Sequence, residues 1–222
     1  MKVGVLLSAG ASTRMGSAKA LVKLKGESFA AAGIRTLWSV CDSVIVVLGH
    51  DAKRIQKSIE AEFVKLVESG KLHRDIQGAH KHGAEGLEVH FVTNRAWKKG
   101  MYSSVRLGLV GAVSLKPESV VVLPVDHPNV KVNTVRALGA GMDAALGAYK
   151  GSRADKKRFA YAIVPRYRGE RGHPLVLTPG LALAIAGDRG AAHLADAVRR
   201  NARLVGYLDV ADKGVVRNRN TR

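Results

Sequence analysis

The sequence predicts an α/β fold of three layers, in which helices cover both faces of a mostly parallel sheet. Short apolar runs rich in β-branched residues alternate with longer amphipathic stretches along the chain, an order typical of parallel strands joined by helices. The chain has 222 residues, 46% of them hydrophobic, which is enough for one sizeable core. We therefore expect a single domain over residues 1–222.

The expected strands are short enough, and apolar enough, to be buried on both faces of a sheet. They cover residues 3–7, 43–48, 89–92, 119–123, 159–164 and 204–208. Between them, apolar residues recur at helical spacings of three and four over residues 29–41, 52–66, 103–113, 132–146 and 190–200. Ligands of such sheets bind at the carboxyl ends of the strands, so we expect the site there.

Two segments depart from this alternation. Residues 68–88 contain four glycines and three histidines, and so long a connection without periodicity predicts a surface excursion, a lid or a flexible insertion. Its His80 and His82 have the spacing of a metal-binding pair, but no nearby carboxylate or thiolate completes a ligand set, which favours ordinary loop histidines. Residues 213–222 form a basic tail.

The formal net charge of +18 favours an anionic partner, and nucleic acid, acidic lipid and nucleotides all qualify. Few aromatic residues accompany the basic runs, which disfavours a surface for stacking single-stranded nucleic acid. No apolar run approaches the roughly 18–20 residues of a membrane span. The lone Cys41 cannot form an intramolecular disulfide and is expected to be buried. The first apolar run is too short for a secretion signal, so we expect a cytoplasmic protein.

The loop after the first strand has the residues of a phosphate site. Gly10 and Gly16 bracket small and hydroxyl-bearing residues, and Arg14 and Lys19 supply positive charge, which together suit a polyphosphate. The spacing differs from the two common phosphate loops, GxxxxGK[ST] and GxGxxG. On this loop alone, a phosphate site and a glycine-rich turn both remain open.

A set of ordered motifs extends the comparison. They are SAGASTRMGSAKAL from Ser8, VVLGH from Val46, NRAWKKGMYSSV from Asn94, LPVDHP from Leu123, and the later pair GHP from Gly172 and GDRGA from Gly187. This set resembles the nucleotidyltransferases of the molybdenum-cofactor type, which have a Rossmann-like fold. Ala9, GHP and GDRGA are closest to the cytidylyltransferase branch, so the resemblance implies CTP as donor and a phosphorylated acceptor such as molybdopterin.

The resemblance also implies roles for particular residues. Backbone amides of the loop would cradle the triphosphate, basic side chains would neutralise its charge, and Mg²⁺ would be held by one carboxylate with phosphate oxygens. The implied catalytic residues are Arg14, Lys19 and Asp126, and the implied metal ligands are Asp126 and Asn220. The implied nucleotide-binding residues are Ser8, Ala9, Gly10, Ala11, Ser12, Arg14 and Lys19, and the implied acceptor-binding residues are Asn94, Gly100, Ser103, Ser104 and His173. Asp188, before Gly190, is either a helix N-cap or a catalytic acid.

The carboxyl terminus departs from the family pattern. Members end in DxDTPxD, whereas Asn218 and Asn220 replace the two acids here, beside Arg217 and Arg219. Asparagine brings no charge, so we expect weaker metal binding. Alternatives therefore stay open: a nucleotidyltransferase for a sugar phosphate or other small acceptor, or a catalytically weakened nucleotide-fold protein that binds anionic polymers or a partner.

Overall fold

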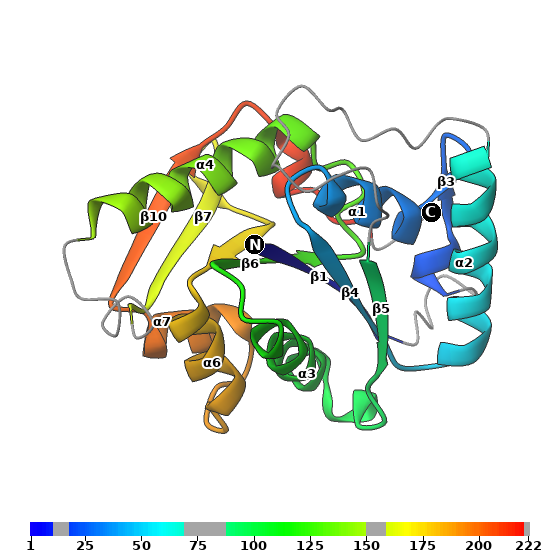
Figure 1. Ribbon diagram of the computed structural model, residues 1–222, viewed down its shortest axis with the longest axis horizontal. Helices are drawn as coiled ribbons and strands as arrows, with labels where there is room; N and C mark the ends of the chain where they lie inside the picture. Colours follow the sequence, from blue (N-terminus) through cyan, green and yellow to red (C-terminus); the bar gives the residue numbers. More distant parts are fainter. Residues whose placement is uncertain (11–17, 69–87, 150–158, 220–222) are drawn as a thin grey trace.

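The sheet of the computed structural model lies between two layers of helices (Figure 1), as the sequence predicts. The structure describes residues 1–10, 18–68, 88–149 and 159–219. Within these ranges the strands pair in the order β10-β7-β9-β6-β1-β4-β5, and β8 pairs with β7. The strands are β1 (Lys2–Ser8), β4 (Ser43–Leu48), β5 (Glu88–Thr93), β6 (Ser119–Pro124), β7 (Tyr161–Tyr167), β8 (Glu170–Arg171), β9 (Leu175–Leu177) and β10 (Leu204–Asp209).

The centre of the sheet is parallel. Strand β1 pairs in parallel with β4 and with β6, and its Leu6 lies opposite Val46 on one side and Leu123 on the other. All residues of these three strands are buried because helices cover both faces, which explains their nearly continuous apolar sequences. Strands β5 and β10 lie at the two ends of the strand order and are partly exposed.

The helices divide between the two faces (Figure 1). One apolar cluster unites the sheet with α1 (Phe29–Trp38), α2 (Ala52–Glu68) and α4 (Val132–Ala148). The other unites it with α3 (Met101–Ser114), α6 (Pro179–Gly187) and α7 (Leu194–Asn201). Short 3₁₀ turns lie at Lys19–Leu21, Trp97–Lys99 and Lys213–Val215, and a two-stranded ribbon joins β2 (Lys23–Leu24) to β3 (Glu27–Ser28). The three-layer α/β prediction is confirmed.

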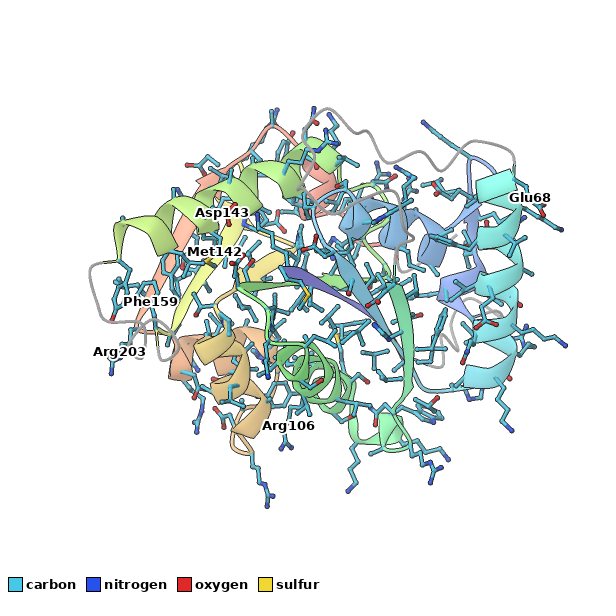
Figure 2. All side chains as sticks on the ribbon, in the orientation of Figure 1. Glu68, Arg106, Met142, Asp143, Phe159 and Arg203 are labelled. Carbon is cyan, nitrogen blue, oxygen red and sulfur yellow. The ribbon has the colours of Figure 1, made fainter. Side chains whose placement is uncertain are left out.

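Helix α4 shows how polar groups are matched within this packing (Figure 2). Its Met142 is fully buried in the apolar cluster, whereas the neighbouring Asp143 accepts a hydrogen bond from Lys2 Nζ at 2.6 Å. Lys2 belongs to the central strand β1 and its side chain is only 9% exposed. A buried ammonium needs such a partner, so this ion pair also fixes α4 against the first residue of β1.

Helix α6 and strand β9 are among the elements that the sequence does not predict. Helix α6 is apolar almost throughout, with sequence PGLALAIAG, so no polar face marks a helical period. Strand β9 has only three residues and runs antiparallel to both β6 and β7. The sheet is therefore mixed. Strand β1 pairs in parallel with β4 and β6, as do β4 with β5 and β7 with β10.

Some predicted boundaries shift. The strand expected over residues 159–164 is Tyr161–Tyr167. The helix expected over residues 190–200 begins at Leu194, and its N-cap is His193, whose Nδ1 accepts from the Asp196 amide. The interpretation of Asp188 as an N-cap of this helix is therefore wrong, because Asp188 follows α6 as its C-cap.

The remaining predictions concern single features. Cys41 is completely buried, as expected, and burial raises the pKa of its thiol. In the part of the chain that the structure describes, no helix has both the length and the apolar character to cross a bilayer. Helix α2 ends at Glu68 and β5 begins at Glu88; the intervening residues 69–87, with His80 and His82, lie outside the described residues.

Candidate active site

The phosphate loop begins where the central strands end. Strand β1 ends at Ser8 between the ends of β4 and β6, since Ser8 pairs with Leu48 and Leu7 pairs with Pro124. The Val125 amide then donates to the Leu7 carbonyl at 3.0 Å. Asp126 thus follows β6 beside the start of the loop, at the edge where parallel sheets bind ligands. Residues 11–17, and with them Ala11, Ser12 and Arg14, lie outside the described residues.

The start of the loop packs against the turn after β4. A Cβ added at Gly49 would overlap the Ala9 carbonyl oxygen and the Trp97 side chain, and the His50 amide donates to that same carbonyl at 3.3 Å. Only glycine permits backbones to approach so closely. The VVLGH motif therefore has a physical role, which is to position the first residues of the loop.

Lys19 and Asp126 meet at this edge. Lys19 Nζ lies 3.5 Å from Asp126 Oδ2, and the two side chains are 22% and 15% exposed. The Arg219 amide donates to the Asp126 carbonyl at 2.8 Å, so the end of the described chain returns to the same place. Partial burial strengthens electrostatic interactions relative to water, and the structure thus brings together two of the three predicted catalytic residues.

Residues 212–216, at the start of the carboxyl-terminal segment, pack against the rest of the protein. Val215 is completely buried. A Cβ at Gly172 would overlap the Val215 carbonyl, and that carbonyl accepts from the His173 amide at 2.8 Å. Asp212, 3% exposed, accepts from the Lys131 and Gly214 amides and from the Thr134 hydroxyl. These contacts hold the segment that delivers Arg219.

Asp212 is a residue that the sequence analysis misses. Its carboxylate accepts three hydrogen bonds from groups 81, 78 and 2 positions away. Only the last of these partners is local, so the only sequence signal is the short Asp212-Lys213-Gly214 turn, which is typical of many surface turns.

Three buried polar atoms near this edge have no hydrogen-bond partner within the described part of the chain. They are Ser8 Oγ, His173 Nδ1 and Arg219 Nε. Unpaired buried polar atoms are costly and uncommon in folded proteins. They come from the end of β1, from the residues just before β9 and from the carboxyl-terminal segment. These segments contact the turn after β6: the Leu7 carbonyl accepts from the Val125 amide, the His173 ring contacts that of His127, and the Arg219 amide donates to the Asp126 carbonyl. This arrangement fits an edge that receives a polar ligand.

The donor set fits a magnesium ion only together with a nucleotide. Among the described residues, no group of three or more His, Cys, Asp or Glu side chains could hold a metal ion. Asp126 offers one carboxylate, and Mg²⁺ is commonly bound by one or two carboxylates plus substrate phosphates. Asn220, the second predicted ligand, lies outside the described residues.

The predicted acceptor residues divide into two groups. Asn94 Nδ2 donates to the Ser103 and Ser104 hydroxyls, both at 2.8 Å, and Asn94 Oδ1 accepts from the Ala96 amide. This cluster surrounds the start of α3, where Gly100 has a φ of 101°. The side-chain amide of Asn94 is therefore engaged within the protein and shapes the first turn of α3.

His173 lies apart from that cluster, on the β9 side. Its ring meets the ring of His127 edge-on, with centroids 5.0 Å apart. Burial, with a smaller contribution from the charge of His127, lowers the pKa of His173 to about 3. The imidazole is thus neutral at physiological pH and offers a hydrogen bond rather than a positive charge.

A pocket of about 870 Å³ opens beside His173. Leu7 and Pro124, at the ends of β1 and β6, form part of its floor, and the first turn of α3, the strands β7 and β10, and α7 form its walls. Since Leu7 and Pro124 immediately precede Ser8 and Val125, this pocket lies next to the phosphate loop.

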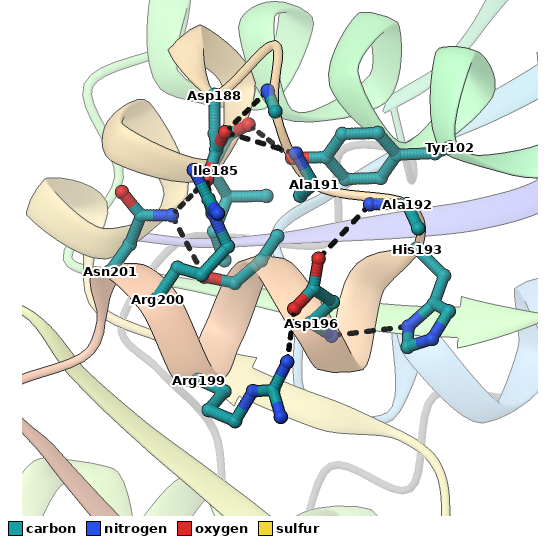
Figure 3. Close-up of polar contacts among 12 residues, drawn as sticks. Tyr102, Ile185, Asp188, Ala191, Ala192, His193, Asp196, Arg199, Arg200 and Asn201 are labelled. Atoms are coloured by element: carbon teal, nitrogen blue, oxygen red, sulfur yellow. Dashed lines mark hydrogen bonds and ion pairs between the residues drawn. The ribbon is translucent and has the colours of Figure 1, made fainter.

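Asp188 fixes α7 as a wall of this pocket (Figure 3). Its carboxylate accepts hydrogen bonds from Asn201 and Arg200 on α7 and from the Gly190 and Ala191 amides. The bonds from Asn201 and then Gly190 lower the pKa of Asp188 to about 2. All four donors belong to the protein itself, so the geometry gives Asp188 a structural task.

The comparisons with known proteins agree with this architecture. The family model described as MobA-like NTP transferase domain matches residues 4–204. The chain belongs to this family of nucleotidyltransferases. A comparison with curated protein sequences gave no significant match.

Solved structures show the same fold at low sequence identity. Rv0371c from Mycobacterium tuberculosis H37Rv is 20% identical, with a TM-score of 0.63 over 94% of this chain and 87% of that one. Its complex with manganese is 19% identical, with a TM-score of 0.60 over 94% and 88%. The 4-diphosphocytidyl-2C-methyl-D-erythritol synthase from Anaerococcus prevotii is 12% identical, with a TM-score of 0.65 over 100% and 91%.

Proposed function

We propose that this protein transfers a nucleoside monophosphate from a nucleoside triphosphate to a phosphorylated small-molecule acceptor and releases pyrophosphate. CTP is the favoured donor. The observation that carries the proposal is the meeting of Lys19 and Asp126 at the carboxyl edge of the sheet, in a chain of the NTP transferase family.

Each group has a task in such a transfer. The reaction needs the acceptor phosphate in line with the α-phosphorus, and it needs the charge of the triphosphate neutralised. Lys19 lies where it can neutralise that charge, and Arg14 is assigned the same task by its place in the loop motif. Asp126 would hold Mg²⁺ together with the nucleotide phosphates, and the ion would stabilise negative charge on the phosphates.

The identities of the donor and the acceptor rest on weaker support. The CTP preference rests on the sequence around Ala9 and on the GHP and GDRGA motifs. Molybdopterin is the acceptor implied by the resemblance, and a sugar phosphate is the alternative. A solved neighbour was crystallised with manganese, so Mn²⁺ should be tested beside Mg²⁺.

Nucleotide binding tests the proposal first. A ligand that binds only the folded state raises the melting temperature, so the protein should be melted with each of the four NTPs, with and without Mg²⁺ or Mn²⁺. We expect the largest increase with CTP and a divalent ion. Release of pyrophosphate should then be measured with CTP and molybdopterin or sugar phosphates. If no NTP raises the melting temperature and no acceptor yields pyrophosphate, the proposal fails.

A further inference from the structure

The pocket beside the phosphate loop has an apolar interior. Leu7 and Pro124 face it from the centre of the sheet, Val164 and Leu175 from β7 and β9, and Val205 from β10. Strand residues on one face of a sheet recur at every second position, and these side chains share the face covered by α3 and α7. A ligand body in this pocket is therefore surrounded mainly by hydrocarbon.

Asp196 and His193, two of the hydrogen-bond acceptors that line the pocket, are engaged around α7, whereas the buried His173 Nδ1 on the same lining has no partner among the described residues. Asp196 Oδ1 accepts from Arg199 at 2.6 Å and Asp196 Oδ2 from the Ala192 amide at 3.1 Å (Figure 3). His193 Nδ1 accepts from the Asp196 amide. The hydroxyls of a sugar, or the N–H groups at the edge of a pterin, need acceptors of this kind, and leaving them unpaired is costly.

A positive group, by contrast, lines one side. The Arg171 guanidinium carbon lies 5.0 Å from the centroid of the Tyr207 ring, and both residues line the pocket. Arg166, on the same ring, is bound by Asp209 through two hydrogen bonds. Within the described ranges, no carboxylate lies at ion-pair distance from Arg171. Its guanidinium thus keeps its donors for an anion, to which it can bind with two parallel hydrogen bonds.

From these observations, and resting on the proposed function, we infer that the acceptor is a phosphorylated compound with an apolar body, aromatic or aliphatic. Its body occupies the space between Leu7, Val164 and Val205, and Arg171 contributes to the charge that attracts its phosphate. This class differs from the sugar phosphates and from the pterins, because both carry several hydrogen-bond donors, whereas the described, buried atoms of the lining leave only His173 Nδ1 without a partner.

The test measures binding of three monophosphates to the purified protein without nucleotide, by calorimetry. The probes are 1-naphthyl phosphate, ribose 5-phosphate and neopterin phosphate, which share the phosphate and differ in the body. Burying one aromatic ring is enough for a tenfold difference in affinity, so we expect a dissociation constant at least about tenfold lower for naphthyl phosphate. Equal or tighter binding of either polar probe would overturn the inference.

Variants test whether the probe binds in this pocket. Val205→Thr keeps the shape of a half-buried side chain and adds a hydroxyl. It should therefore weaken the binding of naphthyl phosphate several-fold and change the binding of ribose 5-phosphate little. Arg171→Gln should weaken all probes. Arg203→Gln removes the same charge from an exposed residue at another edge (Figure 2) and should change nothing. If neither Val205→Thr nor Arg171→Gln weakens the binding of naphthyl phosphate, the probe binds elsewhere and the inference is overturned.

These measurements separate the inference from the proposed function, since they need neither CTP nor turnover. If naphthyl phosphate binds as expected and no NTP binds, the pocket inference stands and the transfer reaction fails. If CTP binds and is transferred to a sugar phosphate that also binds more tightly than naphthyl phosphate, the reaction stands and the inference is overturned.

Discussion

Lys19 and Asp126 are 107 positions apart in the chain, and their charged groups lie 3.5 Å apart at the carboxyl edge of the sheet. The first follows the phosphate loop and the second follows β6. Because parallel strands end at the same edge, the fold brings a cation and a carboxylate together where the proposed function places the triphosphate.

Replacing Lys19 should slow transfer strongly and leave the fold intact. Lys19→Gln removes a preorganised positive charge, and such losses typically cost about 10² to 10³ in rate. The measurement is pyrophosphate release under saturating CTP. Lys23→Gln, at an exposed residue of β2, is the matched control and should keep the full rate. Equal rates for the two variants would remove Lys19 from the reaction.

Replacing Asp126 should abolish the metal dependence of nucleotide binding. Asp126→Asn keeps the size of the side chain and removes the negative charge that a hard cation requires. We expect the Mg²⁺-dependent part of the CTP-induced increase in melting temperature to disappear. Glu118→Gln, at a residue whose side chain is 73% exposed, serves as control. An undiminished Mg²⁺ effect in Asp126→Asn would assign the ion to other ligands.

Two glycines should respond to alanine with opposite signs. In Gly172→Ala, the new Cβ would overlap the Val215 backbone, and such overpacking typically costs about 1–3 kcal/mol. In Gly147→Ala, within α4, the new Cβ meets nothing within 4 Å, and alanine in a helix should stabilise by about 0.5–1 kcal/mol. Urea denaturation measures the free energy of unfolding of both variants. An unchanged free energy of unfolding in Gly172→Ala would mean that the backbone around Val215 moves aside at little cost.

The neutral His173 should make stability depend on pH. Its pKa is about 3 in the folded protein and about 6.5 in an unfolded chain. The unfolded state therefore binds more protons below about pH 6.5, and the free energy of unfolding should fall as the pH is lowered from there toward 3. Denaturation at a series of pH values gives the slope of the free energy of unfolding against pH. This slope should be shallower for His173→Asn, by the equivalent of up to one proton. An unchanged slope would contradict the burial of a neutral ring.

Removing the Asp188 carboxylate should loosen α7. Asp188→Ala leaves the Gly190, Arg200 and Asn201 donors without their shared acceptor. We expect faster amide hydrogen exchange over α7 than in the natural protein, and unchanged exchange in α1 on the opposite face. The low pKa of Asp188, about 2, means that the ionised carboxylate contributes fully above about pH 4, and that its contribution is lost as the pH falls toward 2. Unchanged protection of α7 would show that packing alone holds it.

The sequence by itself determined the fold class, the burial of the central strands and the family. Buried parallel strands have continuous apolar runs, so residues 43–48 and 119–123 could be assigned without coordinates. The loop motif and the Asp after β6 could also be recognised in the sequence, because their residue types suit the binding of phosphate and Mg²⁺. The apolar helix α6 and the short antiparallel β9 could not be predicted, since neither has a periodic polar face or sufficient length.

Only the tertiary structure decided which of these residues meet. The distance between Lys19 and Asp126, the partners of Asp212, and the return of Arg219 to Asp126 all depend on contacts between distant parts of the chain. The same holds for the pocket, whose apolar lining comes from five strands and two helices, and for the low pKa of His173, which results from burial. Sequence periodicity reports which face of an element is buried, whereas packing between elements decides what that face contacts.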